Sequence, residues 1–362
     1  MKRCCYRCFT HPWLKKLIHD DADKLGTCAF CGSKSTALAD ISVLYESFQN
    51  LLSMYNPVQY GVTVHPWEDA FETGDVLTDL IQNDWEIFSD ALLESDRAAE
   101  LLVAIQLSLW EKESGEDLID TGTLYTRRRS IYHTTPAQAW TWYCEGIKEE
   151  PDSVPEIYEF LDEELYRVEE ILPQGRTYYR ARPSYECEKE GVKLPHRGRD
   201  IGAPPPKKAK AGRANAEGNV VLYCADHELT AVRETKESSG SYVSVCELRL
   251  LHDLRIADLS KPIAVPNPFT AEILSYEVEI VNLLNAYAEE MSRPLESEDD
   301  KTEYIPCQIL TAYIRDEARF DGVRYPSAMH PEGTNIVIFN PVSLEVLDSK
   351  LVRLTDDGLT YE

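Results

Sequence analysis

Long apolar runs are missing from this sequence of 362 residues. None approaches the roughly 20 residues that a membrane helix needs, and the N-terminus, MKRCCYRCFTHPW, lacks the apolar stretch of a signal peptide. Low-complexity tracts are also missing, and no G-x-G-x-x-G follows an expected strand, which argues against a Rossmann dehydrogenase. We therefore expect a folded, cytoplasmic protein, long enough for two domains and a small appended module.

Positive charge is scarce. The chain has 37 Lys and Arg residues against 63 Asp and Glu residues, and its formal net charge is −26. Such a charge repels nucleic acid and anionic membranes. Residues 1–35 differ, because they hold seven basic and three acidic side chains. Any contact with nucleic acid is therefore expected to begin there, and no membrane partner is expected.

Disulfides are not expected in a reducing compartment, although the chain has ten cysteines. Four of them form two CxxC pairs, Cys5-Tyr-Arg-Cys8 and Cys28-Ala-Phe-Cys31, separated by 19 residues. Two-residue spacers let both thiolates of a tight turn face one tetrahedral metal ion. The pattern therefore predicts a Zn²⁺ site with Cys5, Cys8, Cys28 and Cys31 as ligands.

The choice of ligands stays open at three residues: Cys4 in place of Cys5, and His11 or His19 in place of one thiolate. The alternative to a metal site is a set of unrelated buried thiols. Four protein ligands close the coordination sphere and leave no position for water or substrate. The predicted zinc is therefore structural, in a zinc-binding module of residues 1–35.

Apolar residues recur at steps of three and four after this module, which predicts helices. The pattern covers 36–56, 75–93, 97–112, 135–149 and 154–172. Residues 36–172 are therefore predicted to form a helical domain.

The pattern changes after Gly175 to short β-rich runs. Strands are predicted at 177–181, 220–224, 242–250, 254–258 and 335–339, and helices at 226–237, 270–290 and 302–319. Residues 173–362 are therefore predicted to form an α+β domain. Residues 184–219, between its first two strands, are too rich in Pro, Gly and Lys for regular structure, and loops of this length often cover binding sites.

Several short blocks between Thr177 and Phe339 resemble the RES domain family, named for its Arg, Glu and Ser. In chain order they are Tyr179-Arg180-Ala181-Arg182, Gly212-Arg213-Ala214-Asn215 with Gly218, Leu222-Tyr223-Cys224-Ala225, Thr230-Ala231-Val232-Arg233-Glu234 and Asp321-Gly322-Val323-Arg324-Tyr325-Pro326-Ser327. The resemblance implies an ADP-ribosyltransferase-like fold with a split β-sheet and a cleft for NAD. The helical region before these blocks resembles the HEPN-type regions that precede RES domains.

The resemblance also implies an activity. It indicates a toxin or defence effector that cleaves the nicotinamide ribosidic bond of NAD by hydrolysis or phosphorolysis, or that ADP-ribosylates a protein. NAD is then a substrate and not a recycled cofactor. A toxin of this kind implies an antitoxin or a regulatory protein as partner, and the N-terminal zinc and helical regions are expected to sense a trigger or to restrain the site.

Cleavage of this bond passes through an oxocarbenium-like transition state, which needs negative charge near the ribose. Glu234, on a helix that follows a predicted strand, is the candidate for that charge. Arg180 is a charge inside a strand and is the candidate for two parallel hydrogen bonds to the pyrophosphate. Arg182 is the alternative, because it shares the strand face of Arg180.

Four other residues complete the candidate site. Tyr223 is expected to place its ring against nicotinamide and its hydroxyl on the ribose or phosphate. Ser327 is expected to hydrogen-bond the ribose or the carboxamide. No G-x-S-x-G elbow surrounds Ser327, so we do not expect a nucleophile there. Arg213 and Asn215 are expected in a loop that closes over the dinucleotide. Each residue type is also common without a function. A glutamate is often exposed on a helix, an arginine often forms a salt bridge, a tyrosine is often half-buried in a strand, and a serine often occurs in a turn.

Two alternatives come from other functional classes. Arg129 and His133 have the four-residue spacing used by HEPN ribonucleases, although surface charge explains the Arg127–Arg129 cluster more simply. The other alternative is a zinc-dependent binding module whose C-terminal domain has lost catalysis. The joint presence of the four candidate catalytic residues argues against it: Arg180, Tyr223, Glu234 and Ser327.

Overall fold

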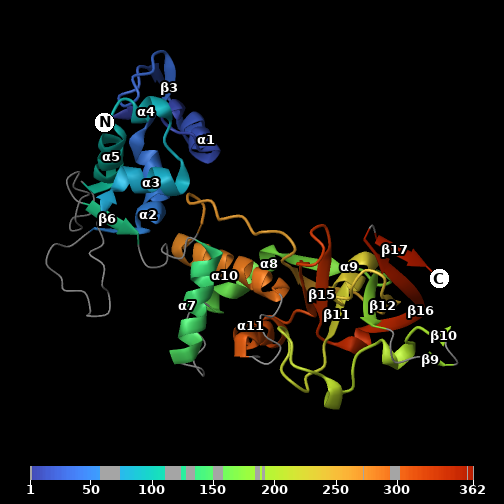
Figure 1. Cartoon of the computed structure of the whole chain (residues 1–362). Coiled ribbons are helices and arrows are strands. Elements are labelled where there is room, and N and C mark those ends of the chain that lie inside the picture. Colours follow the sequence, from blue (N-terminus) through green and yellow to red (C-terminus); the bar gives the residue numbers. More distant parts are fainter. Residues whose placement is uncertain are drawn as a thin grey trace. The chain divides into compact units, whose positions relative to one another are not determined.

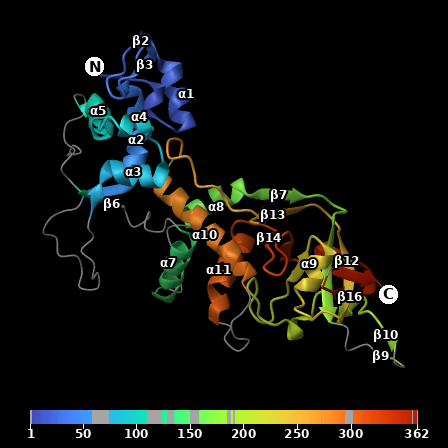
Figure 2. The same cartoon turned by 45° about the horizontal axis from the view of Figure 1, so that its top comes forward.

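The computed structural model describes residues 2–57, 74–110, 124–127, 135–149, 158–183, 188–189, 192–271, 273–293, 302–356 and 358–361. The chain forms two compact units. The N-terminal unit comprises residues 1–134 with 265–279, and the C-terminal unit comprises residues 135–264 with 280–362. Figures 1 and 2 show the elements of each unit in two views. None of the helices in these described ranges is long and apolar enough to cross a membrane.

The N-terminal unit combines short strands with helices. One sheet has the order β1-β3-β2 (Arg3–Cys4, Thr36–Asp40, Lys24–Gly26), and another has the order β4-β6-β5 (Tyr55–Pro57, Leu124–Arg127, Asp75–Val76). The helices are α1 (Pro12–Asp21), α2 (Tyr45–Leu52), α3 (Leu77–Trp85), α4 (Asp90–Leu93) and α5 (Ala98–Trp110), with 3-10 turns at η1 (Tyr6–Cys8) and η2 (Ile41–Leu44).

Two predicted helices of this unit are interrupted. Residues 36–40 are not helical, because they form a strand that pairs with β1 and β2. Asp40 then caps the next turn by accepting a hydrogen bond from the Ser42 N–H. The helix expected over 75–93 ends at Glu86, which has a φ of 48°, and a new helix begins after Ser89. The spacing of apolar residues gives no information about where these local caps begin or end a helix.

One hydrophobic core joins the cysteine region to the helices that follow it. Cys8 and Phe9 are buried in the same cluster as Phe48 of α2. Phe269, which is far away in the sequence, belongs to this cluster too. The two units therefore differ from the boundaries expected at 35/36 and 172/173, because burial in one core keeps the cysteine region, the first helices and residues 265–279 together.

The C-terminal unit is built on a nine-stranded sheet with the order β17-β16-β12-β8-β11-β15-β14-β13-β7. The pair β13 and β14 is parallel. Between β8 and β11 the sheet is split, because these strands share a single residue pair, Tyr179 with Ala225. This arrangement confirms the predicted α+β class. The strands are β7 (Glu169–Leu172), β8 (Thr177–Pro183), β11 (Leu222–Ala225), β12 (Tyr242–Leu250), β13 (Leu254–Asp258), β14 (Gly322–Pro326), β15 (Thr334–Ile338), β16 (Leu344–Thr355) and β17 (Gly358–Tyr361).

Helices pack against this sheet. They are α7 (Pro136–Glu149), α8 (Tyr158–Arg167), α9 (Glu228–Arg233), α10 (Leu274–Ser292) and α11 (Ile305–Asp316). Figures 1 and 2 show α7, α10 and α11 beside one another. Tyr143 of α7, Leu283 of α10 and Leu310 of α11 are buried in one cluster with Val337 of β15, so these helices cover the strands that carry the site.

The predicted strands of this unit are confirmed to within two residues at each end, while β14, β16 and β17 were not among them. The helix expected over 154–172 is wrong at its C-terminal end. Helix α8 stops at Arg167, and β7 follows because its residues pair with β13.

The polar loop between β8 and β11 packs against the sheet. It contains two short strands, β9 (Glu188–Lys189) and β10 (Val192–Lys193), and two 3-10 turns, η3 (Gly198–Asp200) and η4 (Pro206–Lys208). Ile201 is fully buried in a hydrophobic cluster with Tyr178 of β8 and Leu222 of β11. Residues 192–219 of the loop therefore have a defined path despite their composition.

Candidate active site at the split in the sheet

A cavity of about 350 Å³ opens where the sheet splits, which is within the usual size range of small-molecule sites. Because β8 and β11 share one residue pair only, space remains between the two halves of the sheet. Helix α9 and the strands β14 and β15 complete the walls. Seven polar side chains line the cavity: Tyr179, Arg180, Tyr223, Glu234, Thr235, Tyr325 and Asn335.

Glu234 stands at the C-terminal end of α9, where the helix meets the cavity. Its Oε1 accepts a hydrogen bond of 2.6 Å from Ser327 Oγ and one of 2.7 Å from Asn335 Nδ2. Both donors reach the same oxygen. Within the described part of the chain, no donor contacts Oε2. One carboxylate oxygen is therefore anchored while the other keeps its lone pairs available.

Ser327 is held by the turn that follows β14. Its N–H donates to the carbonyl of Gly333 at 3.0 Å, and its Oγ accepts from the N–H groups of Met329 at 3.3 Å and His330 at 3.1 Å. The hydroxyl proton goes to Glu234. With its lone pairs and its proton engaged, Ser327 positions the carboxylate and is not arranged as a nucleophile.

Arg180 projects from β8 into the cavity without an acidic partner. Its Nε donates to the carbonyl of Ile201 at 2.9 Å and its Nη1 to the carbonyl of Tyr223 at 2.8 Å. No carboxylate among the described residues forms an ion pair with it. Burial lowers the pKa of the Arg180 guanidinium from its ordinary value. A desolvated cation that lacks a counter-ion favours the binding of an anion.

Tyr223 lines the cavity, but its hydroxyl is engaged with the loop. The hydroxyl donates to Asn215 Oδ1 at 3.0 Å and accepts from the Ala214 N–H at 3.0 Å. Burial raises the pKa of this hydroxyl. A Cβ at Gly212 would lie 2.7 Å from the hydroxyl oxygen, so glycine is needed for this close approach. The ring of Tyr223 is therefore fixed in place by its own hydroxyl.

The three predicted substrate-binding residues lie outside the cavity wall. Arg182 donates to the carbonyls of Asp200 and Gly202, which fastens the loop to β8. Arg213 is buried, with Nη1 3.6 Å from Glu290 Oε2 and Nε bonded to the carbonyl of Arg293. Nδ2 of Asn215 donates to three carbonyls of its own loop: Lys210, Ala216 and Asn219. In this structure Arg182, Arg213 and Asn215 therefore hold the loop in its conformation.

Tyr179, Tyr325 and Asn335 belong to the cavity but were not among the candidate residues. Tyr179 directly precedes Arg180, and Tyr325 lies two residues before Ser327, so both tyrosines belong to the sequence blocks that resemble the RES domain family. Asn335 was missed because it lies in a strand that resembles an ordinary apolar one. Its polarity inside that apolar run was the available signal.

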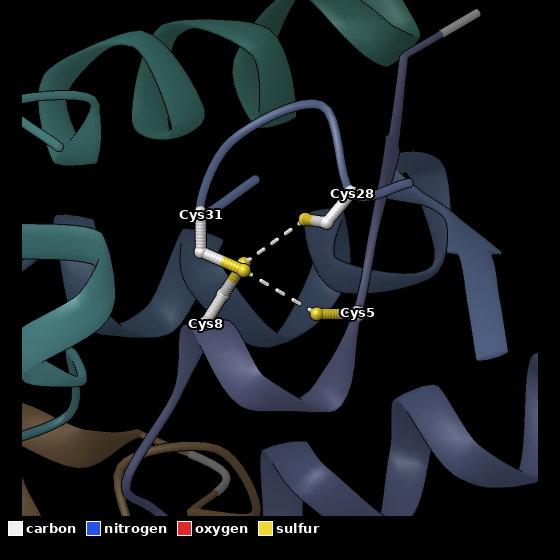
Figure 3. A group of neighbouring side chains, drawn as sticks. All are labelled: Cys5, Cys8, Cys28 and Cys31. Carbon is white, nitrogen blue, oxygen red and sulfur yellow. Dashed lines mark hydrogen bonds between the residues drawn. The ribbon is translucent and has the colours of Figure 1, made fainter. Parts of the chain in front are cut away.

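The second candidate site is the cysteine cluster of the N-terminal unit. Cys5, Cys8, Cys28 and Cys31 place their sulfur atoms within 4.8 Å of one another. Sγ of Cys5 lies 3.5 Å from Sγ of Cys31, and Sγ of Cys8 lies 3.4 Å from Sγ of Cys28 (Figure 3). Four thiolates around a tetrahedral zinc at about 2.3 Å lie about 3.8 Å apart. The cluster therefore fits a zinc knuckle and can hold a metal ion.

The three alternative ligands lie elsewhere. Cys4 is fully buried in the hydrophobic core and is not part of the cluster. The His11 ring contacts the Phe269 ring edge to face at 4.9 Å. The His19 side chain is 76% exposed. Gly32, directly after Cys31, has a φ of 71°, a conformation that favours glycine in this turn. The HEPN-type pair Arg129 and His133 lies outside the described residues.

Comparison with known proteins identifies the C-terminal region. Residues 178–357 match the model of the RES domain. This region of the chain belongs to the RES domain family. No curated protein and no solved structure matches it. The RES match includes Arg180, Tyr223, Glu234 and Ser327 and confirms the resemblance seen in the sequence. RES domains are associated with NAD-related enzymatic activity. The HEPN resemblance of the preceding region stays a prediction.

Proposed function

We propose that the RES domain cleaves the bond between nicotinamide and ribose in NAD. The observation that carries this proposal is the Glu234 carboxylate, which is anchored through Oε1 and presents its other oxygen at a cavity that also contains an unpaired arginine. A carboxylate suits the ribose, which becomes positively charged during cleavage, and a guanidinium suits the negatively charged pyrophosphate. NAD contains both groups.

The chemistry requires a negative charge close to the ribose. Cleavage breaks the bond from C1′ to the nicotinamide nitrogen, and the electron pair leaves with nicotinamide, which becomes neutral. Positive charge develops at C1′ and on the ring oxygen. Oε2 of Glu234 stabilises that charge or holds a ribose hydroxyl, because its lone pairs are available. Water adds to C1′ and loses a proton, or inorganic phosphate adds instead.

Arg180 supplies the opposite charge. Two of its N–H groups are bound to backbone carbonyls, which fixes the plane of the guanidinium. The remaining N–H groups are left for the pyrophosphate oxygens, and the planar fork suits phosphate better than a lysine does. The rings of Tyr179, Tyr223 and Tyr325 give the cavity an aromatic lining for the flat nicotinamide.

The test is nicotinamide release from NAD by the purified full-length chain, measured by liquid chromatography with and without phosphate. We expect turnover by the wild type and a loss of at least 100-fold in Glu234→Gln and in Arg180→Ala. Glu332→Gln is the matched control, because Glu332 is an exposed carboxylate in the turn next to Ser327. It should keep wild-type turnover.

Two outcomes separate this proposal from its alternatives. A wild-type chain that releases no nicotinamide under any of these conditions would contradict it. Nicotinamide release accompanied by labelled ADP-ribose on protein would assign transfer to a protein acceptor in place of water or phosphate, since both reactions use the same donor site.

For the cysteine cluster we propose Zn²⁺ in a structural role. Four thiolates are the donor set that zinc prefers, and they occupy all tetrahedral positions. The cluster lies in the hydrophobic core of the N-terminal unit, so the ion stabilises that core.

A further inference from the structure

Asn335 is a polar residue in the buried strand β15. Its neighbours Ile336, Val337 and Ile338 are fully buried, and Asn335 is itself 7% exposed. A buried amide without a hydrogen bond costs about 1–3 kcal/mol. Its Nδ2 group donates to Glu234 Oε1 at 2.7 Å. The polar residue therefore has a specific partner, which is the carboxylate of the proposed site.

The backbone of Asn335 is held from both sides. It pairs with Ala225 of β11 on one side and with Tyr325 of β14 on the other. Both neighbours line the cavity. A side chain on such a central strand has little freedom to move, and its amide is planar. Asn335 is therefore a rigid donor, in contrast to a serine hydroxyl that rotates about its C–O bond.

The two hydrogen bonds of Glu234 meet at one oxygen. A carboxylate that receives both donors on Oε1 is turned so that Oε2 points away from them. The orientation of the Glu234 carboxylate thus depends on a strand residue 101 positions away.

We propose that Asn335 is a positioning residue for the reaction: it orients the Glu234 carboxylate. This inference rests on the proposed NAD cleavage. Asn335 acts through Glu234 and not through the substrate, so its effect falls on kcat and leaves KM within a few-fold of the wild-type value.

The decisive experiment is a double-mutant cycle between Asn335→Ala and Glu234→Gln in the full chain. We expect Asn335→Ala alone to lower kcat about 10- to 100-fold, which matches the loss of one hydrogen bond to a charged group. In the Glu234→Gln background the same substitution should change kcat less than about threefold, because its partner is already lost. Additive losses from an active wild type would overturn the inference.

A second variant protects the test against simple misfolding. Asn335→Asp keeps the shape of the side chain but places a carboxyl group beside Glu234. Its kcat should be lowest at neutral pH and should recover relative to the wild type as the pH falls, because a shared proton restores the donor. A purely structural defect would lower kcat equally at all pH values. Asn219→Ala, on an exposed loop asparagine, is the control.

Failure of the inference differs from failure of the proposed function. If the wild type releases no nicotinamide, the proposed function is wrong. If the wild type is active and Asn335→Ala is additive with Glu234→Gln, only the role of Asn335 is wrong.

Discussion

The hydroxyl oxygen of Thr230 lies 2.7 Å from Nδ1 of His330. Thr230 stands one helical turn before Glu234 on α9, and His330 belongs to the turn that carries Ser327. Two hydrogen bonds therefore join helix α9 to this turn: one between Thr230 and His330, and one between Glu234 and Ser327. The geometry of the carboxylate depends on how closely the two segments approach.

Gly333 permits that approach. A Cβ there would overlap the Thr230 hydroxyl and lie 2.7 Å from Nδ1 of His330. We expect Gly333→Ala to push the turn from α9, to lower the free energy of unfolding by about 1–3 kcal/mol, and to reduce nicotinamide release at least tenfold. Denaturant unfolding and the release assay check both effects. Gly146→Ala is the control, because nothing lies within 4 Å of a Cβ on that helical glycine. Unchanged release by Gly333→Ala would contradict the prediction.

Removal of the Tyr223 hydroxyl tests whether it serves the loop or the substrate. The structure ties this hydroxyl to Asn215 and to the Ala214 N–H. Tyr223→Phe should therefore lower the free energy of unfolding by about 1–2 kcal/mol and change kcat by less than about tenfold, since the ring stays. Steady-state kinetics and denaturant unfolding measure the two effects. A 1,000-fold loss of kcat at full stability would instead place the hydroxyl on the substrate.

Metal content tests the cysteine cluster. The purified chain should contain one zinc ion per molecule by elemental analysis, and Cys31→Ser should lose it because three thiolates bind zinc more weakly than four. A strong chelator should lower the melting temperature for the same reason. Cys4→Ala should keep the ion, since Cys4 lies outside the cluster. Full zinc content in Cys31→Ser would show that another ligand set binds it.

Phe269 tests whether residues 265–279 stabilise the N-terminal unit. Its ring stacks on Trp13 at 5.7 Å and contacts Phe48 at 5.6 Å. Phe269→Ala should lower the free energy of unfolding by about 3–5 kcal/mol, measured by calorimetry. Val265→Ala in the same segment should have a small effect, because Val265 is 53% exposed. Equal effects of the two substitutions would argue against a shared core.

Cys224 lines the cavity but is not expected to react. Burial raises the pKa of its thiol to about 12. Below that pH the thiol stays protonated, and the thiolate is the nucleophilic form. Iodoacetamide at pH 8 should therefore leave Cys224 unmodified in the folded chain and modify it after unfolding, as mass spectrometry can show. Cys224→Ala should still cleave NAD. Rapid labelling of the folded chain would contradict this.

Much of the molecule could be recognised from local patterns. The two CxxC pairs predicted the metal cluster, because both cysteines of each pair share one turn. The blocks around Arg180, Glu234 and Ser327 identified the RES domain, and period-two patterns located most strands of the large sheet. These features depend on residues that are close in the sequence, so spacing and residue type are enough.

Other features depend on contacts over long sequence distances. Glu234 receives its hydrogen bonds from residues 93 and 101 positions away, and no local pattern identifies Asn335 as a partner. Arg213 and Asn215 share a motif with the site, yet their donors bind elsewhere in the fold. Phe269 lies between two elements of the RES match but packs into the core of the N-terminal unit. The spacing of apolar residues predicts which face of a helix or strand is buried. Which other element packs against that face is set by the free energy of packing the whole chain.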